Sequence, residues 1–298
     1  MRKILTICLT FLCAAQLSAQ DRVDEIRRKL LSCDESSVIV VAHRADWRNY
    51  PENSLEAVES AIRMGVDMVE LDVQRTMDGV LILMHDHSLD RTTTGHGNIS
   101  EVTWDYISGL NLKNGCGIAT DQKVPTLEQA LLLCKDRVMI NLDKADRYFA
   151  EIFDLLEKTG TTDLILMKGW QPAERVREQF GAYLDKIIYM PVVNLDEEAS
   201  GKIVADHLEV LDPVAFEMCF SDDRSAMVGK MGDILKGRSL IWINSLWASL
   251  CGGHHDDVSM EDVGNGYEYL IDRLGARIIQ TDRPQYLLEY LRLRGLHN

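Results

Sequence analysis

The chain has 298 residues, an apolar fraction of 46% and a formal net charge of −15. This length allows one large α/β domain or two small ones, and the apolar fraction is enough for a substantial core. The negative charge argues against nucleic acid or an anionic membrane as an electrostatic partner, but it leaves an anionic small molecule open, because a metal ion and a few cations can reverse the local field.

Residues 1–19 have the pattern of a secretory signal peptide. Arg2 and Lys3 form a charged start, residues 4–15 are apolar, and residues 17–19 (Leu-Ser-Ala) are an acceptable cleavage site. The apolar run is too short for a membrane span. We therefore predict a secreted or periplasmic protein with no integral membrane span after removal of the signal; a retained N-terminal anchor is the alternative.

Five cysteines follow the signal peptide, namely Cys33, Cys116, Cys134, Cys219 and Cys251. Their odd number and irregular spacing give neither a disulfide framework nor a CxxC metal motif. One disulfide could form in an oxidising compartment, but we expect each cysteine to be a structural thiol.

The remaining chain is expected to hold a lead-in segment, residues 20–37, and one main domain, residues 38–298. A short amphipathic helix is expected over residues 21–31. Apolar strands follow at residues 38–43 and 68–74, around a helix that Asn53 or Ser54 could cap.

The segment after the second strand breaks this rhythm. Too few residues separate Val73 from Val80 for a parallel crossover, so Val80 to His85 is expected to turn back as a hairpin partner. Residues 90–122 are rich in Gly, Thr and Asn and show little periodicity. We predict a small insertion at about residues 76–122, after a hairpin that extends the second strand.

A strand–helix rhythm then resumes. Further strands are expected at residues 138–143, 164–168, 187–193, 215–220, 240–244 and 277–281, and a polar loop at residues 252–257. Without the hairpin partner, the chain has eight parallel strands, each with a helix. This number in under 300 residues predicts an α/β fold with a (β/α)8 TIM barrel. A doubly wound open sheet is the alternative.

Acidic side chains lie at the ends of the expected strands. Alternation directs Glu70 and Asp72 to the same face of their strand, and Asp143 ends the next parallel strand. Close carboxylates repel one another unless a cation is present, and hard oxygen ligands select Mg²⁺ or Ca²⁺. We predict a divalent metal site at these three residues; a solvated acidic pair is the alternative.

Two histidines also end strands. His43 precedes Arg44, and His85 precedes Asp86. Histidine can take or give a proton near neutral pH, and an arginine can bind phosphoryl oxygens with two parallel hydrogen bonds. His43 and His85 are the candidates for acid–base catalysis, with Arg44 as the anion-binding residue; core histidines are the alternative.

An ordered set of short motifs runs from Val38 to Gly97. The motifs are His43-Arg44, Pro51-Glu52-Asn53-Ser54, Glu70-Leu71-Asp72-Val73, Asp78-Gly79, His85-Asp86, Leu89-Asp90-Arg91-Thr92-Thr93 and Gly95-His96-Gly97. This stretch, roughly a fifth of the chain, resembles the glycerophosphodiester phosphodiesterase family. A weaker match lies at Thr281-Asp282-Arg283-Pro284.

The resemblance implies metal-dependent hydrolysis of a small glycerophosphodiester to glycerol 3-phosphate and an alcohol. In that family the glycerol hydroxyl beside the phosphodiester attacks first, and water opens the resulting cyclic phosphate. The usual third metal ligand is a glutamate, so Asp143 is a departure that leaves Mg²⁺ or Ca²⁺ open. The alternatives are a phospholipase-type lyase that stops at the cyclic phosphate and a barrel that only binds phosphoesters.

Three further residues are expected to bind substrate or support the site. The family often has a lysine two residues after its third carboxylate; here Lys144 follows Asp143 directly, and on a regular strand its side chain would point away from the site. Either the strand is bulged there and Lys144 is the site lysine, or Lys168 at the end of the next strand supplies the positive charge; we favour Lys168. Glu52 is expected to orient His43 or touch the metal, and Trp242 to wall the substrate pocket, with core packing as its alternative. The sequence carries no signal for the head group or the oligomeric state.

Overall fold

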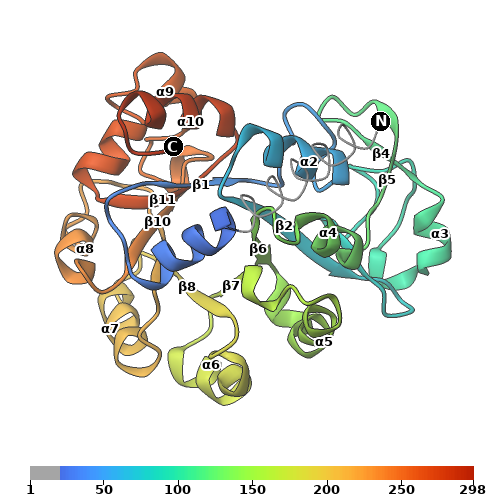
Figure 1. Cartoon of the computed structure of the whole chain (residues 1–298), viewed down its shortest axis with the longest axis horizontal. Helices are drawn as coiled ribbons and strands as arrows, with labels where there is room; N and C mark the ends of the chain where they lie inside the picture. Colours follow the sequence, from blue (N-terminus) through green and yellow to red (C-terminus); the bar gives the residue numbers. More distant parts are fainter. Residues whose placement is uncertain (1–20) are drawn as a thin grey trace, which may run out of the picture.

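The computed structural model describes residues 21–298, so the predicted signal peptide lies outside the described residues. Within that range eight parallel strands form a closed ring in the order β1-β11-β10-β9-β8-β7-β6-β2, and β1 pairs with β2 to close it (Figure 1). This ring confirms the predicted (β/α)8 barrel. The strands are β1 (Ile39–Ala42), β2 (Met68–Arg75), β6 (Met139–Asp143), β7 (Ile165–Gly169), β8 (Ile188–Asn194), β9 (Ala215–Cys219), β10 (Leu240–Asn244) and β11 (Ala276–Thr281).

Helices surround the ring (Figure 1). Of the two residues proposed to cap the first of them, Ser54 is the cap, because its side chain accepts a hydrogen bond from Ala57 N–H. Gly65 ends the same helix with φ +88°, a conformation that glycine adopts without strain. The helices are α2 (Leu55–Met64), α4 (Leu127–Cys134), α5 (Phe149–Thr159), α6 (Ala173–Phe180), α7 (Ser200–Val210), α8 (Val228–Leu235), α9 (Asp256–Glu261) and α10 (Pro284–Leu293).

The polar loop predicted at residues 252–257 is wrong at its end, because α9 begins at Asp256. The Asp256 side chain is buried, and the several hydrogen bonds that it accepts compensate for its burial. A single π-helical turn, Tyr269–Arg273, follows before β11.

The hairpin after β2 forms as predicted. Strand β3 (Leu81–Leu83) pairs antiparallel with the end of β2, with Val73 opposite Leu83. The segment beyond it contains α3 (Trp104–Ser108) and a two-stranded sheet of β4 (Asn111–Lys113) and β5 (Ala119–Lys123), which the sequence did not predict. It has a small core of its own, made of Ile82, Met84, Leu89, Ile99, Ile107, Leu112 and Val124.

Alternation along β2 decides what faces the barrel interior. Val69, Leu71 and Val73 belong to the core between the strands and the helices, while Met68 belongs to the core inside the ring. Glu70 and Asp72 share the inward face with Met68. The ring is therefore apolar at the amino ends of its strands and polar at the carboxyl ends.

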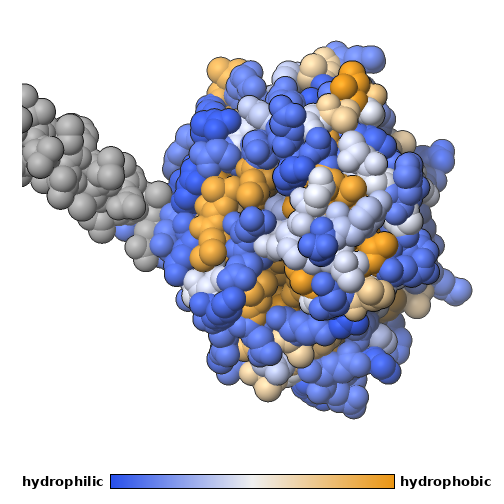
Figure 2. Space-filling model, turned by 90° about the vertical axis from the view of Figure 1, so that its right-hand side faces the viewer, coloured by the Kyte–Doolittle hydropathy of each residue, from blue (hydrophilic) through white to orange (hydrophobic). Residues whose placement is uncertain are grey.

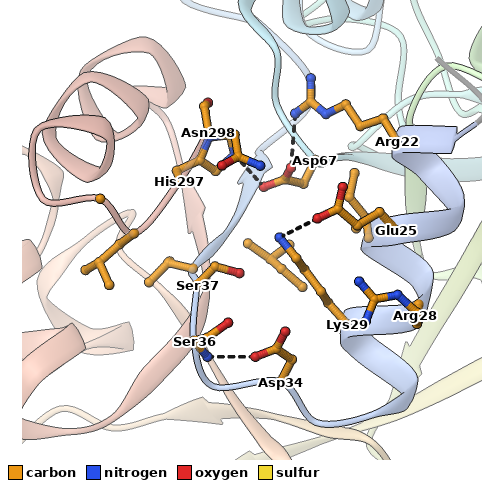
Figure 3. A pocket seen from close by; sticks show the side chains of 15 residues that line it. Arg22, Glu25, Arg28, Lys29, Asp34, Ser36, Ser37, Asp67, His297 and Asn298 are labelled. Carbon is orange, nitrogen blue, oxygen red and sulfur yellow. Dashed lines mark hydrogen bonds and ion pairs between the residues drawn. The ribbon is translucent and has the colours of Figure 1, made fainter. Parts of the chain in front are cut away.

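The amino end of the ring is closed by the helix over residues 21–31. Its apolar side chains Val23, Ile26 and Leu30 are buried against the interior of the ring. Beside this helix the buried Asp67 carboxylate accepts hydrogen bonds from Val40 N–H at 2.8 Å, His297 Nε2 at 2.9 Å and Arg22 Nη2 at 3.1 Å (Figure 3). Asp67 thereby ties the lead-in helix to the C-terminal end of the chain.

Replacing Asp67 with asparagine is expected to lower the free energy of unfolding by about 2–3 kcal/mol at pH 7, because hydrogen bonds to a charged group are lost. Burial alone would raise the pKa of Asp67, but His297, Val40 N–H and Arg22 outweigh it and lower the pKa. A carboxyl group whose pKa is lower in the folded than in the unfolded protein stabilises the fold. This stabilisation is complete above the unfolded pKa of about 4, and it is lost as the pH falls through the pKa of the folded state.

Urea denaturation of both proteins between pH 7 and pH 3 measures this difference. The gap between wild type and Asp67→Asn should shrink below about pH 4, where unfolded aspartate becomes protonated. The matched control is Asp272→Asn, because Asp272 forms a more exposed pair with Arg294 and should cost under about 0.5 kcal/mol. A gap that stayed constant with pH would contradict the role of the Asp67 charge.

The outer surface is mainly polar. Figure 2 shows the face around the right-hand side of Figure 1 as mostly hydrophilic, with apolar side chains in separate patches. Over residues 21–298, no helix has the length and apolar character needed to cross a membrane. The five cysteines in this range are all free thiols.

Candidate functional site

A cavity of about 360 Å³ opens at the carboxyl ends of the barrel strands. This is the end at which TIM barrels carry their active sites. Most of the charged and amide side chains that line it lie on strands of the ring or directly after them; the full set is His43, Arg44, Glu70, Asp72, His85, Asp143, Lys144, Asp146, Arg147, Lys168, Glu217, Asn244 and Gln280. A second cavity, at the amino end beside Asp67, is lined by Arg22, Lys29 and their neighbours and holds none of the predicted site residues (Figure 3).

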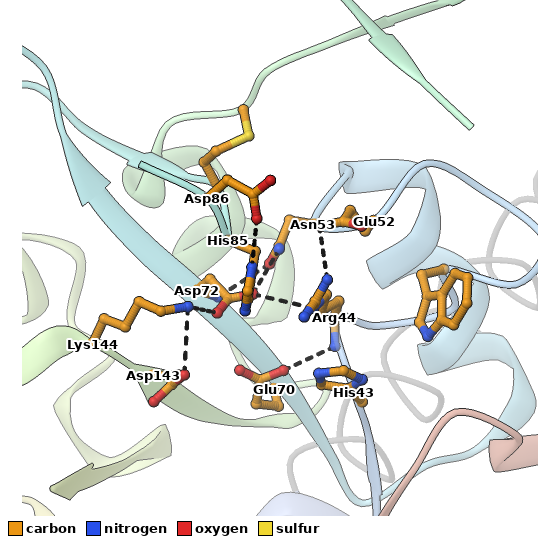
Figure 4. A network of polar contacts seen from close by, with 12 residues as sticks. His43, Arg44, Glu52, Asn53, Glu70, Asp72, His85, Asp86, Asp143 and Lys144 are labelled. Carbon is orange, nitrogen blue, oxygen red and sulfur yellow. Dashed lines mark hydrogen bonds and ion pairs between the residues drawn. The ribbon is translucent and has the colours of Figure 1, made fainter. Parts of the chain in front are cut away.

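The three predicted metal ligands converge. Asp72 lies opposite Asp143 in the pairing of β2 with β6, and carboxylate oxygens of Glu70, Asp72 and Asp143 lie within 4.8 Å of one another (Figure 4). Burial and the charge of Asp72 raise the pKa of Glu70 to about 7. Burial would also raise the pKa of Asp72, but Lys144, His85 and Arg44 outweigh it and lower the pKa to about 2.

Asn53 holds Asp72 in this cluster. Its Nδ2 donates to Asp72 Oδ2 at 2.9 Å and its Oδ1 accepts from Asp72 N–H at 3.1 Å. The backbone of Asn53 has φ +59°, which turns the side chain toward β2 instead of capping α2. Each carboxylate oxygen has two lone pairs, so these contacts leave acceptor capacity for a cation. The residues therefore fit a hard divalent metal ion.

Both candidate lysines reach the site, which corrects the prediction that favoured Lys168 over Lys144. Lys144 has φ +61°, so its side chain turns back and Nζ lies 2.5 Å from Asp72 Oδ1 and 3.7 Å from Asp143 Oδ2. Lys168 Nζ lies 3.1 Å from Glu217 Oε2 and 3.9 Å from Asp143 Oδ1. A left-handed residue directly after a strand is what alternation could not anticipate.

Arg44 links the histidine end of β1 to the acidic cluster. Its backbone N–H donates to Glu70 Oε2 at 2.9 Å, and Nη1 donates to Glu52 Oε1 at 3.1 Å (Figure 4). Glu52 also pairs with Arg91 and does not line the cavity. The expectation that Glu52 orients His43 or touches the metal is therefore wrong, and it holds Arg44 instead.

Each histidine is paired with a carboxylate. His85 Nδ1 lies 2.7 Å from Asp86 Oδ1 (Figure 4). Arg91 donates to both oxygens of Asp86. Arg91 is the main cause of a strongly lowered pKa of Asp86. His43 Nδ1 lies 2.7 Å from Asp282 Oδ1. Both imidazoles line the same cavity, as predicted.

Trp242 does not reach the cavity. It points into the ring but lies one layer below the opening, fully buried, and donates from Nε1 to Asn244 Oδ1 at 2.7 Å. Two residues later on β10, Asn244 lines the cavity and donates to Glu217 Oε1 at 2.8 Å. Core packing, the alternative for Trp242, is therefore correct, and the sequence missed Asn244, Gln280 and the role of Asp282.

The closed eight-stranded ring, with carboxylates, imidazoles and a guanidinium gathered in one cavity at the carboxyl ends of its strands, defines a TIM-barrel protein with an acidic cluster beside two histidines. Residues 43–166 match the model of the Glycerophosphoryl diester phosphodiesterase family. The resemblance predicted from the motifs is confirmed. A second model, described only as a domain of unknown function, matches residues 189–291.

Similar proteins agree with this placement. A glycerophosphodiester phosphodiesterase of Caldanaerobacter subterraneus is 39% identical over 108 residues, 35% of this chain and 44% of the relative. Glycerophosphodiester phosphodiesterase 1 of Homo sapiens is 39% identical over 103 residues, 33% of this chain and 30% of the relative. The aligned stretch thus spans less than half the length of these relatives.

The likeness of fold extends further than the likeness of sequence. The crystal structure of a glycerophosphoryl diester phosphodiesterase from Parabacteroides distasonis superimposes with a TM-score of 0.73 at 22% identity, covering 91% of this chain and 92% of that one. At this identity the comparison establishes the barrel alone.

Proposed function

We propose that the protein hydrolyses glycerophosphodiesters to glycerol 3-phosphate and an alcohol. The observation that carries this proposal is that two imidazoles, a guanidinium and three carboxylates line one cavity. These groups, from His43 to Asp143, all lie within the residues that match the family model.

The histidines would divide the proton transfers between them. Each has Nδ1 on a carboxylate, which accepts only, so each would carry its proton on Nδ1 and use Nε2 for chemistry. One ring takes the proton of the attacking hydroxyl or water, and the other gives a proton to the leaving alkoxide. Arg44, held by Glu52, stabilises the charge that grows on the phosphoryl oxygens.

Glu70, Asp72 and Asp143 would hold a divalent cation, Mg²⁺ or Ca²⁺. When bound, such a cation supplies charge stabilisation to phosphoryl oxygens as a Lewis acid. The ammonium groups of Lys144 and Lys168 lie beside the same carboxylates and limit the negative charge that an anionic diester meets on entry.

Incubating the purified protein with a panel of glycerophosphodiesters tests the proposal, with choline, ethanolamine, glycerol and inositol as leaving groups. We expect linear glycerol 3-phosphate from at least one diester, detected by phosphorus NMR. A product that remains a cyclic phosphate would favour the lyase alternative. Binding without turnover on every diester would favour a barrel that only binds phosphoesters.

A further inference from the structure

The partner of His43 comes from the opposite end of the chain. Asp282, directly after β11, places Oδ1 2.7 Å from His43 Nδ1, although 239 residues separate them. Both side chains are only 10% exposed. Trp47 Nε1 donates to the same oxygen at 2.6 Å. His43 Nε2 has no hydrogen-bond partner among residues 21–298, and the ring lines the cavity.

A second carboxylate fixes Asp282. Asp256 is 1% exposed, and its Oδ2 accepts from Asp282 N–H at 2.7 Å. Its Oδ1 accepts from three hydroxyl groups at 2.6–2.8 Å, those of Ser245, Tyr267 and Thr281. A buried carboxylate is costly unless it is well hydrogen-bonded, and this one joins the ends of β10 and β11 to the start of α9.

The other histidine has a different support. Asp86, which holds His85, is 28% exposed and is bound by the guanidinium of Arg91. Asp282 has no such close arginine: Arg48 Nη2 lies 3.8 Å from its Oδ2. The negative charge of Asp282 is therefore shielded less, and it faces the imidazole in a more buried setting.

We infer that Asp282 is the positioning residue of His43 and that Asp256 holds Asp282 in place for this task. A carboxylate can only accept, so the pair keeps the proton of His43 on Nδ1 and leaves the lone pair of Nε2 toward the cavity. Its charge also stabilises the imidazolium that forms when His43 takes up a proton. The inference rests on the proposed function, which it deepens.

Two variants of Asp282 separate geometry from charge. Asp282→Ala removes both, and kcat is expected to fall by about 10²–10⁴-fold, the usual contribution of a general acid or base, with KM changed by less than about threefold. In Asp282→Asn, Trp47 N–H and His43 N–H still need an acceptor at one point, so the amide oxygen stays there. Only the charge is lost, and kcat should fall less, by about 10–10²-fold.

Asp256 provides a second test with a matched control one residue away. In Asp256→Asn the amide oxygen accepts from the three hydroxyl groups, so the NH₂ group faces the backbone N–H of Asp282. Two donors then oppose each other, and Asp282 loses the hydrogen bond that holds it. The kcat of this variant should fall about tenfold or more. Asp257 lies on the same helix but is 64% exposed and pairs with Arg283. Asp257→Asn is expected to keep wild-type kcat and KM.

A spectroscopic readout keeps the inference independent of turnover. In metal-free protein with ¹⁵N-labelled histidine, His43 Nδ1–H should give a proton resonance far downfield, assigned by its loss in His43→Gln and absent in Asp282→Ala. If the wild type hydrolyses diesters but Asp282→Ala and Asp282→Asn keep its kcat, the inference is overturned. Survival of the resonance in Asp282→Ala would overturn it too. If the wild type hydrolyses no diester, the proposed function fails, and the resonance alone decides whether the pair forms.

Discussion

Replacing His43 with alanine is expected to lower kcat toward glycerophosphodiesters by about 10²–10⁴-fold, because the variant loses one of the two groups that transfer protons. The kcat of His85→Ala is expected to fall by a similar factor, since both rings line one cavity and would serve one reaction. Steady-state kinetics on the best diester of the panel, with saturating divalent cation, measures both. KM should change less than kcat, because neither imidazole is the main anchor of the phosphoryl group.

The double variant adds a sharper test. When two groups act as a unit, removing the second one costs little further activity. The kcat of His43→Ala/His85→Ala should therefore be only slightly below that of the slower single variant. The matched control is His96→Ala, because His96 is 80% exposed and makes only a surface pair with Asp90. Unchanged hydrolysis in His43→Ala would remove His43 from the mechanism.

Chelation of divalent cations is expected to abolish turnover, and added Mg²⁺ or Ca²⁺ to restore it. The reason is electrostatic: carboxylate oxygens of the buried Glu70 and Asp72 and of the partly buried Asp143 lie within 4.8 Å of one another, and a cation relieves their repulsion. Glu70→Gln and Asp143→Asn each remove one charged ligand, so metal affinity should fall at least about tenfold. Calorimetric titration of metal-free protein measures the affinity directly.

A carboxylate outside the cluster serves as the control for this experiment. Glu151 is exposed and pairs with Arg75 on the outer surface, so Glu151→Gln should bind metal as the wild type does. Full activity after chelation, in protein that elemental analysis finds free of divalent cations, would contradict a metal-dependent reaction. Activity that returns with one cation and not the other would identify the metal.

The barrel could be predicted from sequence because its strands are apolar runs bounded by turns, with a helix after each one. The short sheet of β4 and β5 could not. Residues Ala119–Lys123 alternate only between exposed and half-buried, and their sequence, ATDQK, has no apolar face to mark a strand. Their pairing with Asn111–Lys113 is a tertiary outcome that local patterns do not encode.

The site was predictable where alternation or a motif decides the direction of a side chain, as for Glu70, Asp72 and the two histidines. The depth of a side chain in the barrel could not be predicted. Alternation turns Trp242 inward, but it does not show that this residue lies below the opening of the cavity. The local backbone conformation could not be predicted either. The positive φ of Lys144 turns its side chain back, so that its ammonium group reaches Asp72. Asp256, in the polar run His254-His255-Asp256-Asp257, looked like a loop residue, since the hydroxyl donors that bury it come from Ser245, Tyr267 and Thr281.

The ring is closed by its first and last strands: β1 hydrogen-bonds to β11, and His43 meets Asp282 across that seam. Asp282 lies 239 positions after His43, so during synthesis all of the intervening chain must be made before the imidazole can meet its carboxylate. A growing chain that already carries His43, Glu70, Asp72 and His85 still lacks this contact. The His43–Asp282 contact thus forms only when the barrel closes, so a polypeptide that ends before β11 lacks both the closed ring and this contact.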